Sequence, residues 1–174
     1  MRLPHLSRDC SGTAAAEMAL ILPAIAFILL NVVDLSMYIY TKMQVDLAAH
    51  EAVGSARVLC DLATELPATI NCGGTLTSTM LAAAQSTTLG SNVTVASTAE
   101  KFYCANASGV LVEVAAANAT PPANCAATVS GSTSAPGIYI NTTASYTFSP
   151  VFPGASVASA LSSPITRTAW LRLK

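Results

Sequence analysis

Charged residues are scarce in this chain, and their scarcity argues against several kinds of function. Only 8 Lys and Arg and 9 Asp and Glu occur among 174 residues, giving a formal net charge of −1. No basic cluster is available to neutralise a run of phosphates, so a nucleic acid is not expected as a partner. Between residues 66 and 166 the only charged residues are Glu100, Lys101 and Glu113. Such a surface, polar mainly through Ser, Thr and Asn, suits an extracytoplasmic domain packed among other proteins.

The sequence also lacks the residue patterns of catalytic and metal sites. It has two histidines, His5 and His50, and contains no nucleophile elbow, P-loop or dinucleotide fingerprint. His50-Glu51 is not followed by the second histidine of a zinc-protease motif, and no CxxC pair occurs. We therefore predict no enzymatic activity, no metal and no cofactor.

One long apolar run is present and organises the chain. Residues 13–33 contain a single charge, Glu17. At about 1.5 Å per residue in a helix, these 21 residues cross the roughly 30 Å hydrocarbon core of a bilayer. Arg2 and Arg8 precede the run, so the positive-inside rule places the amino terminus in the cytoplasm and the rest of the chain outside. Residues 13–33 are predicted to be a transmembrane helix.

The helical pattern continues beyond the apolar run. Pro23 lies within the run, where we expect a kink that membrane helices tolerate. Small or apolar residues then recur at spacings of three and four, at Val45, Ala49, Ala52, Ala56 and Leu59. This pattern predicts one helix over residues 13–59. Its outer half, residues 34–60, is amphipathic and should lay one face on a folded head of residues 61–174.

The head reads as one short helix followed by strands. Residues 61–74 are predicted to be a loop and residues 75–88 a helix. Alternating or β-branched segments predict strands at 92–97, 110–114, 138–148 and 165–173. Because no helices separate these strands, the sheet should be mainly antiparallel. The predicted fold class is α+β: a long N-terminal helix packed on a mainly antiparallel four-stranded sheet, with a short second helix.

Cysteine usage agrees with an oxidising compartment. Cys10 precedes the apolar run without a lipobox, and four cysteines follow it: Cys60, Cys72, Cys104 and Cys125. Four cysteines allow three pairings. We favour Cys60 with Cys72 and Cys104 with Cys125, because each pair closes a loop rich in turn-forming residues. The alternative is four reduced thiols.

The boundary before the apolar run has the features of a processing site. Gly12 ends a short basic leader, residues 1–12, and Glu17 follows five residues later. Cleavage between Gly12 and Thr13 would create an amine at Thr13, a cation about one helical turn from Glu17, on the same or a neighbouring subunit. Alternatively, Gly12 is incidental and Glu17 reaches the headgroup level of a permanently anchored protein.

These residues resemble a known family. A leader ending in Gly12, a carboxylate at Glu17 and an uncut apolar helix are similar to the class III signal of type IV pilin-like proteins. The sequence of residues 17–20, the Leu22-Pro23 step and residues 51–57 resemble TadE-like proteins, the pseudopilins of the Tad (Flp) pilus machinery. Residues 146–153 and 165–174 look like the carboxyl end of the same family.

The resemblance implies a function in assembly. A TadE-like protein would be a minor pilin that helps initiate, cap or anchor a Tad (Flp) type IV pilus for surface adherence. Its expected partners are a prepilin peptidase, other minor pilins (TadF-like), the Flp major pilin and the inner-membrane pilus platform. It would reside in the bacterial inner membrane, with its head periplasmic, or in a surface pilus. The alternatives are a permanently membrane-anchored extracytoplasmic binding module and a minor pseudopilin of a related type IV filament or secretion system.

Overall fold

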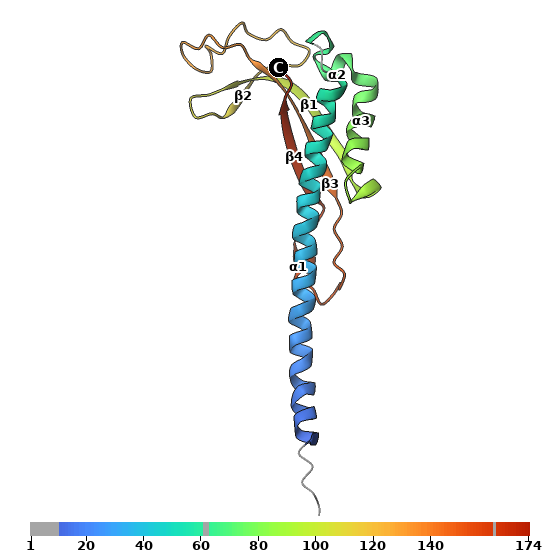
Figure 1. Cartoon of the computed structure of the whole chain (residues 1–174). Coiled ribbons are helices and arrows are strands. Elements are labelled where there is room, and N and C mark those ends of the chain that lie inside the picture. Colours follow the sequence, from blue (N-terminus) through green and yellow to red (C-terminus); the bar gives the residue numbers. More distant parts are fainter. Residues whose placement is uncertain (1–10, 61–62, 162) are drawn as a thin grey trace, which may run out of the picture. The chain divides into compact units, whose positions relative to one another are not determined.

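The computed structural model describes residues 11–60, 63–161 and 163–174 (Figure 1). Its elements form two compact units. The first reaches to Ile39 and includes Ser149–Leu161, and the second consists of Tyr40–Phe148 and Ser162–Lys174. The fold is α+β, with a long apolar N-terminal helix and an antiparallel sheet, so the predicted fold class is confirmed.

The N-terminal helix, α1, spans Ser11–Leu59. The prediction of one helix over residues 13–59 is therefore confirmed to within two residues. Pro23 lies inside α1, which continues past it as a single element. Four of the five positions predicted for the inner stripe of its outer half, Val45, Ala49, Ala52 and Ala56, are fully buried. The fifth, Leu59, is only partly buried.

The sheet of the second unit has four strands, β1 (Thr94–Ala105), β2 (Leu111–Ala116), β3 (Gly137–Tyr146) and β4 (Ile165–Arg172). They lie in the order β2-β1-β3-β4, and every neighbouring pair is antiparallel. All four strands fall where the sequence predicts them. The predicted end of the first strand was wrong, because β1 runs to Ala105 and does not end at residue 97. The adjacent charges Glu100 and Lys101 and a register shift between Ala96 and Ala99 conceal its alternation.

The prediction of one loop over residues 61–74 was wrong. That segment contains a 3-10 turn at Ala63–Glu65, the four-residue helix α2 (Ala68–Asn71) and the beginning of α3 (Gly73–Gln85). The predicted second helix, residues 75–88, corresponds to α3. Two further 3-10 turns lie at Gly90–Asn92 and Val157–Ala160. The sequence of α2 has no strong helix-forming pattern. The helix is held instead by a residue from β1 that pairs with its first amide groups, as described below.

The core of the second unit lies between the helices and one face of the sheet. Burial alternates along β3, where Ile138, Ile140, Thr142 and Ala144 face inward. From α3, the buried side chains are Leu76, Met80 and Ala84. Small residues on α1 allow its backbone to come close to these neighbours, so the core is built from one helix face rich in alanine against larger aliphatic side chains.

Truncating a side chain in the core of the second unit tests this packing. Ile140 on β3 is fully buried. Truncation to Ala removes apolar contacts and leaves a cavity, so Ile140→Ala should lower the free energy of unfolding by about 2–5 kcal/mol. Urea titration of the variant and the parent protein in one detergent, followed by circular dichroism, measures the change. Val110→Ala, at a position 59% exposed, is the control and should change the stability little.

Candidate processing and assembly segment

The processing site predicted from the sequence lies at the first turn of α1. The backbones of Gly12 and Thr13 are helical in this structure, and residues 1–10 of the leader lie outside the residues it describes. Glu17 is exposed on α1, one turn farther along. Its carboxylate has no ion-pair partner among the described residues. Within the part of the chain that the structure describes, this exposed carboxylate is therefore available to a group on another molecule.

A continuous apolar surface follows Glu17. Every described side chain from Ala15 to Leu29 is exposed. The large ones include Met18, Leu20, Ile21, Leu22, Ile25, Phe27, Ile28 and Leu29. Among the described residues, α1 is the only helix long and apolar enough to cross a membrane. A surface of this kind is stable only against lipid or other apolar protein, and it is compatible with a membrane anchor.

The comparison with protein families falls on this helix. A family model described as TadE-like protein matches residues 12–53. Residues 12–53 are therefore similar to TadE-like proteins. The TadE-like match begins at Gly12, includes Glu17 and Pro23, and ends within the outer half of α1. It covers neither the sheet nor residues 146–174, so the resemblance of the carboxyl end stays a prediction. No curated protein and no solved structure matches the chain.

The structure adds a polar site on α1, within the matched segment, that sequence reasoning missed. Asp34 is completely buried, although the apolar side chains next to it on α1, those of Val33 and Leu35, are exposed. Its two carboxylate oxygens accept hydrogen bonds from the backbone amides of Val151 (2.8 Å) and Phe152 (3.2 Å). The Ser156 side chain hydrogen-bonds to the same carboxylate. The segment Ser149–Leu161, which we call the strap, therefore covers the only charged residue between positions 18 and 41.

Asn31, one turn before Asp34, makes a second attachment to the strap. Its amide nitrogen donates to the carbonyl oxygen of Ala155 (3.1 Å), and its side-chain oxygen accepts from the amide of Val157 (2.7 Å). The same nitrogen also donates to the carbonyl of Phe27 within α1 (2.8 Å). The sequence signal for this site was two polar residues three positions apart, hence on one helix face, at the end of an otherwise apolar run.

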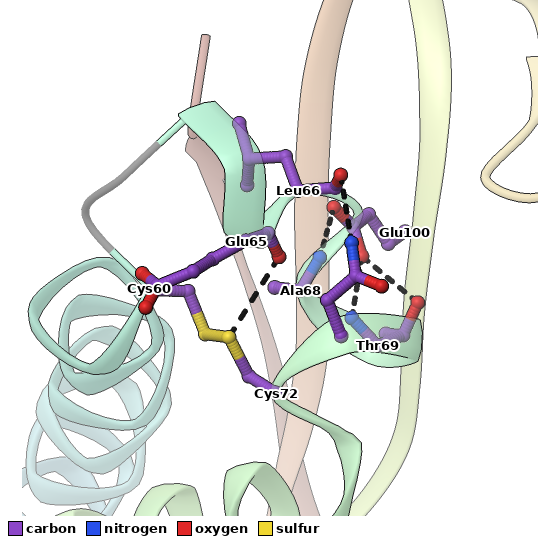
Figure 2. Close-up of a disulfide and its surroundings, with 8 residues drawn as sticks. Cys60, Glu65, Leu66, Ala68, Thr69, Cys72 and Glu100 are labelled. Carbon is purple, nitrogen blue, oxygen red and sulfur yellow. Dashed lines mark hydrogen bonds between the residues drawn. A yellow bond between two sulfur atoms is a disulfide. The ribbon is translucent and has the colours of Figure 1, made fainter.

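The second unit contains a buried carboxylate, Glu100 on β1, that holds α2 (Figure 2). One oxygen accepts from the amide of Ala68 (2.9 Å), and the other accepts from the amide and hydroxyl of Thr69 (2.8 Å each). The unpaired amide groups at the start of a helix carry a partial positive charge, which a carboxylate neutralises. Glu100 therefore joins the sheet to the short helix.

The structure pairs Cys60 with Cys72 and Cys104 with Cys125, the pairing that the loop argument favoured. The first disulfide ties the end of α1 to the start of α3, beside the Glu100 contacts (Figure 2). The second ties β1 to the long connection between β2 and β3. Both bonds thus fix segments with little regular structure to the framework of the second unit.

Loss of the first disulfide should be measurable. The bridge closes a short loop, so replacing both Cys60 and Cys72 with Ser should lower the free energy of unfolding by about 3 kcal/mol on a loop-entropy estimate. Chemical unfolding of the double variant and the parent, compared in one detergent, measures the loss. Equal stability of the two proteins would contradict the structural role of this bond.

The outer face of the sheet carries an aromatic cluster. Tyr103 on β1 makes edge-to-face contacts with Tyr139 on β3 and Trp170 on β4, at centroid distances of 5.8 and 5.5 Å. Arg172 lies 6.0 Å from the ring centre of Tyr139. Trp170 is 46% exposed. No group of three His, Cys, Asp or Glu among the described residues is arranged to hold a metal ion.

Proposed function

We propose that this TadE-like protein is a minor pilin that helps initiate, cap or anchor assembly of a Tad (Flp) pilus. The observation that carries the proposal is the exposed apolar surface of α1. It begins inside the family match with the exposed carboxylate of Glu17, which has no ion-pair partner among the described residues. Helices of this kind pack together when lipid or apolar protein surrounds them. A filament supplies such neighbours once the subunit leaves the membrane.

In this proposal the chain has four parts. Residues 1–12 are a leader removed by a prepilin peptidase, and residues 13–33 span the inner membrane. Residues 34–60 are the extracytoplasmic half of the same helix, and residues 61–174 are the periplasmic head. The partners are other minor pilins, the Flp major pilin and the inner-membrane platform of the pilus. The same features also suit a pseudopilin of a related type IV filament or secretion system.

The test is the amino terminus of the protein isolated from membranes, in cells with and without the prepilin peptidase. We expect a terminus at Thr13 that requires the peptidase, detected by intact mass and terminal sequencing. Gly12→Val places a branched side chain at the cut and should slow cleavage by more than about tenfold, a barrier increase of roughly 1.4 kcal/mol. Ser11→Ala, one residue away, is the matched control and should be cut normally.

The alternative outcome is equally specific. A chain that keeps Met1 or Arg2 at its terminus, in cells that cleave their other pilins, would contradict the processed form. That result, together with absence of the protein from sheared surface fractions, would favour a permanently anchored extracytoplasmic binding module.

A further inference from the structure

The strap, Ser149–Leu161, has a composition unlike that of an ordinary water-exposed loop. Its thirteen residues include no charged side chain. The side chains of Val151 and Val157 are 58% and 60% exposed, and Leu161 is 37% exposed. Loops that run through water normally present polar side chains, because their backbone groups and surroundings are hydrated. The strap instead presents aliphatic side chains outward.

The backbone of the strap is largely paired without water. Pro150 and Pro153 have no N–H group. The amides of Val151, Phe152 and Val157 donate to the side chains of α1 described above. Four further amides donate within the strap, those of Ala155, Ala158, Ser159 and Leu161. A non-helical segment can lie in or near the membrane only if its backbone groups are hydrogen-bonded, because an unpaired amide in hydrocarbon costs several kcal/mol.

The attachment points place the strap at one level of the apolar helix. Asn31 lies near the end of the proposed membrane span and Asp34 just beyond it, about 4.5 Å apart along the helix axis. Asp34 is the only charge between residues 18 and 41, a stretch about 36 Å long, and the strap buries it completely. Figure 1 shows this segment running beside α1. By covering the one charge, the strap extends the apolar surface of the helix beyond residue 33.

We propose that the strap contacts lipid: Val151, Val157 and Leu161 insert into the outer boundary of the bilayer, while Asn31 and Asp34 hold the strap's backbone. The occupant is the phospholipid of the membrane that α1 spans, because the strap is uncharged, is paired internally and is tied to the end of that span. The inference rests on the membrane anchoring in the proposed function. In the mature protein it sets the depth at which α1 sits before assembly.

Tryptophan fluorescence in vesicles tests this contact. In the full chain, Trp170→Phe removes the single tryptophan, and one new tryptophan is then placed at position 157, 27 or 110. Each protein is reconstituted at low density into phosphatidylcholine vesicles with or without brominated acyl chains, which quench tryptophan on contact. Position 27, in the proposed membrane span, is the positive control for lipid contact. Position 110, an exposed residue of the second unit, is the negative control, because water should surround it.

We expect brominated lipid to quench Phe27→Trp and Val157→Trp by about twofold or more, as for side chains 5–10 Å inside the boundary, and to leave Val110→Trp unchanged. Quenching at position 27 without quenching at position 157 would overturn the lipid contact and leave the membrane anchoring intact. Absence of quenching at both positions would overturn both. Val151→Trp, at another exposed position near the beginning of the strap, repeats the measurement in case one substitution disturbs the strap.

Discussion

Replacing Glu17 with Ala should lower incorporation of the protein into pili by at least about 100-fold. In the proposed assembly, this carboxylate meets the Thr13 amine of a neighbouring processed subunit in an apolar environment. Removing one member of a buried ion pair leaves the other charge unpaired at a cost of about 3–5 kcal/mol, and 1.4 kcal/mol corresponds to a factor of ten. The measurement is the amount of protein in sheared pili, divided by the amount in membranes.

The control is Asp46→Ala, which removes an exposed acid from the outer half of the same helix. It should assemble normally. Terminal sequencing must show that Glu17→Ala is still cut before Thr13, so that an assembly defect is separated from a processing defect. Normal recovery of correctly processed Glu17→Ala from pili would refute the role assigned to the carboxylate.

Glu100→Gln should lower the free energy of unfolding by about 2–4 kcal/mol. The buried Glu100 carboxylate accepts three hydrogen bonds from Ala68 and Thr69, whereas an amide offers one oxygen and turns an NH₂ group toward a donor. Charge-assisted hydrogen bonds contribute about 1.5–3 kcal/mol each, and a buried donor left without an acceptor adds its desolvation cost. Urea unfolding of the detergent-solubilised protein measures the loss.

The matched control is Glu113→Gln, because Glu113 is the other acid of the sheet. Its carboxylate forms an exposed ion pair with Lys101 at 2.6 Å, and this hydrogen bond raises the pKa of Lys101. Exposed pairs contribute little to stability because water screens them, so the change should stay below about 1 kcal/mol. An equal loss in both variants would contradict the special role of Glu100.

Local sequence patterns were sufficient to predict structure wherever residues close in sequence are also close in space. The long helix, the positions of four strands along the chain and the buried stripe at Val45, Ala49, Ala52 and Ala56 all follow from periodicity. Failures occurred where a distant residue supplied the missing partner. Helix α2 was predicted as loop because Glu100, more than thirty residues away, pairs with its first amides. The strand that contains Glu100 was predicted too short because two adjacent charges and a register shift interrupt its alternation.

By itself, the sequence determined the apolar helix, its Gly12 and Glu17 positions and the four strand segments, because each depends on spacing along one segment. Only the tertiary structure decided the burial of Asp34 under the strap and the order of the strands in the sheet. Asp34 and Val151 are 117 positions apart, and the folded chain alone brings a carboxylate and two amides together. In sequence, an acid after an apolar run indicates the end of a span; in the structure, the strap's amides satisfy that acid and remove it from solvent.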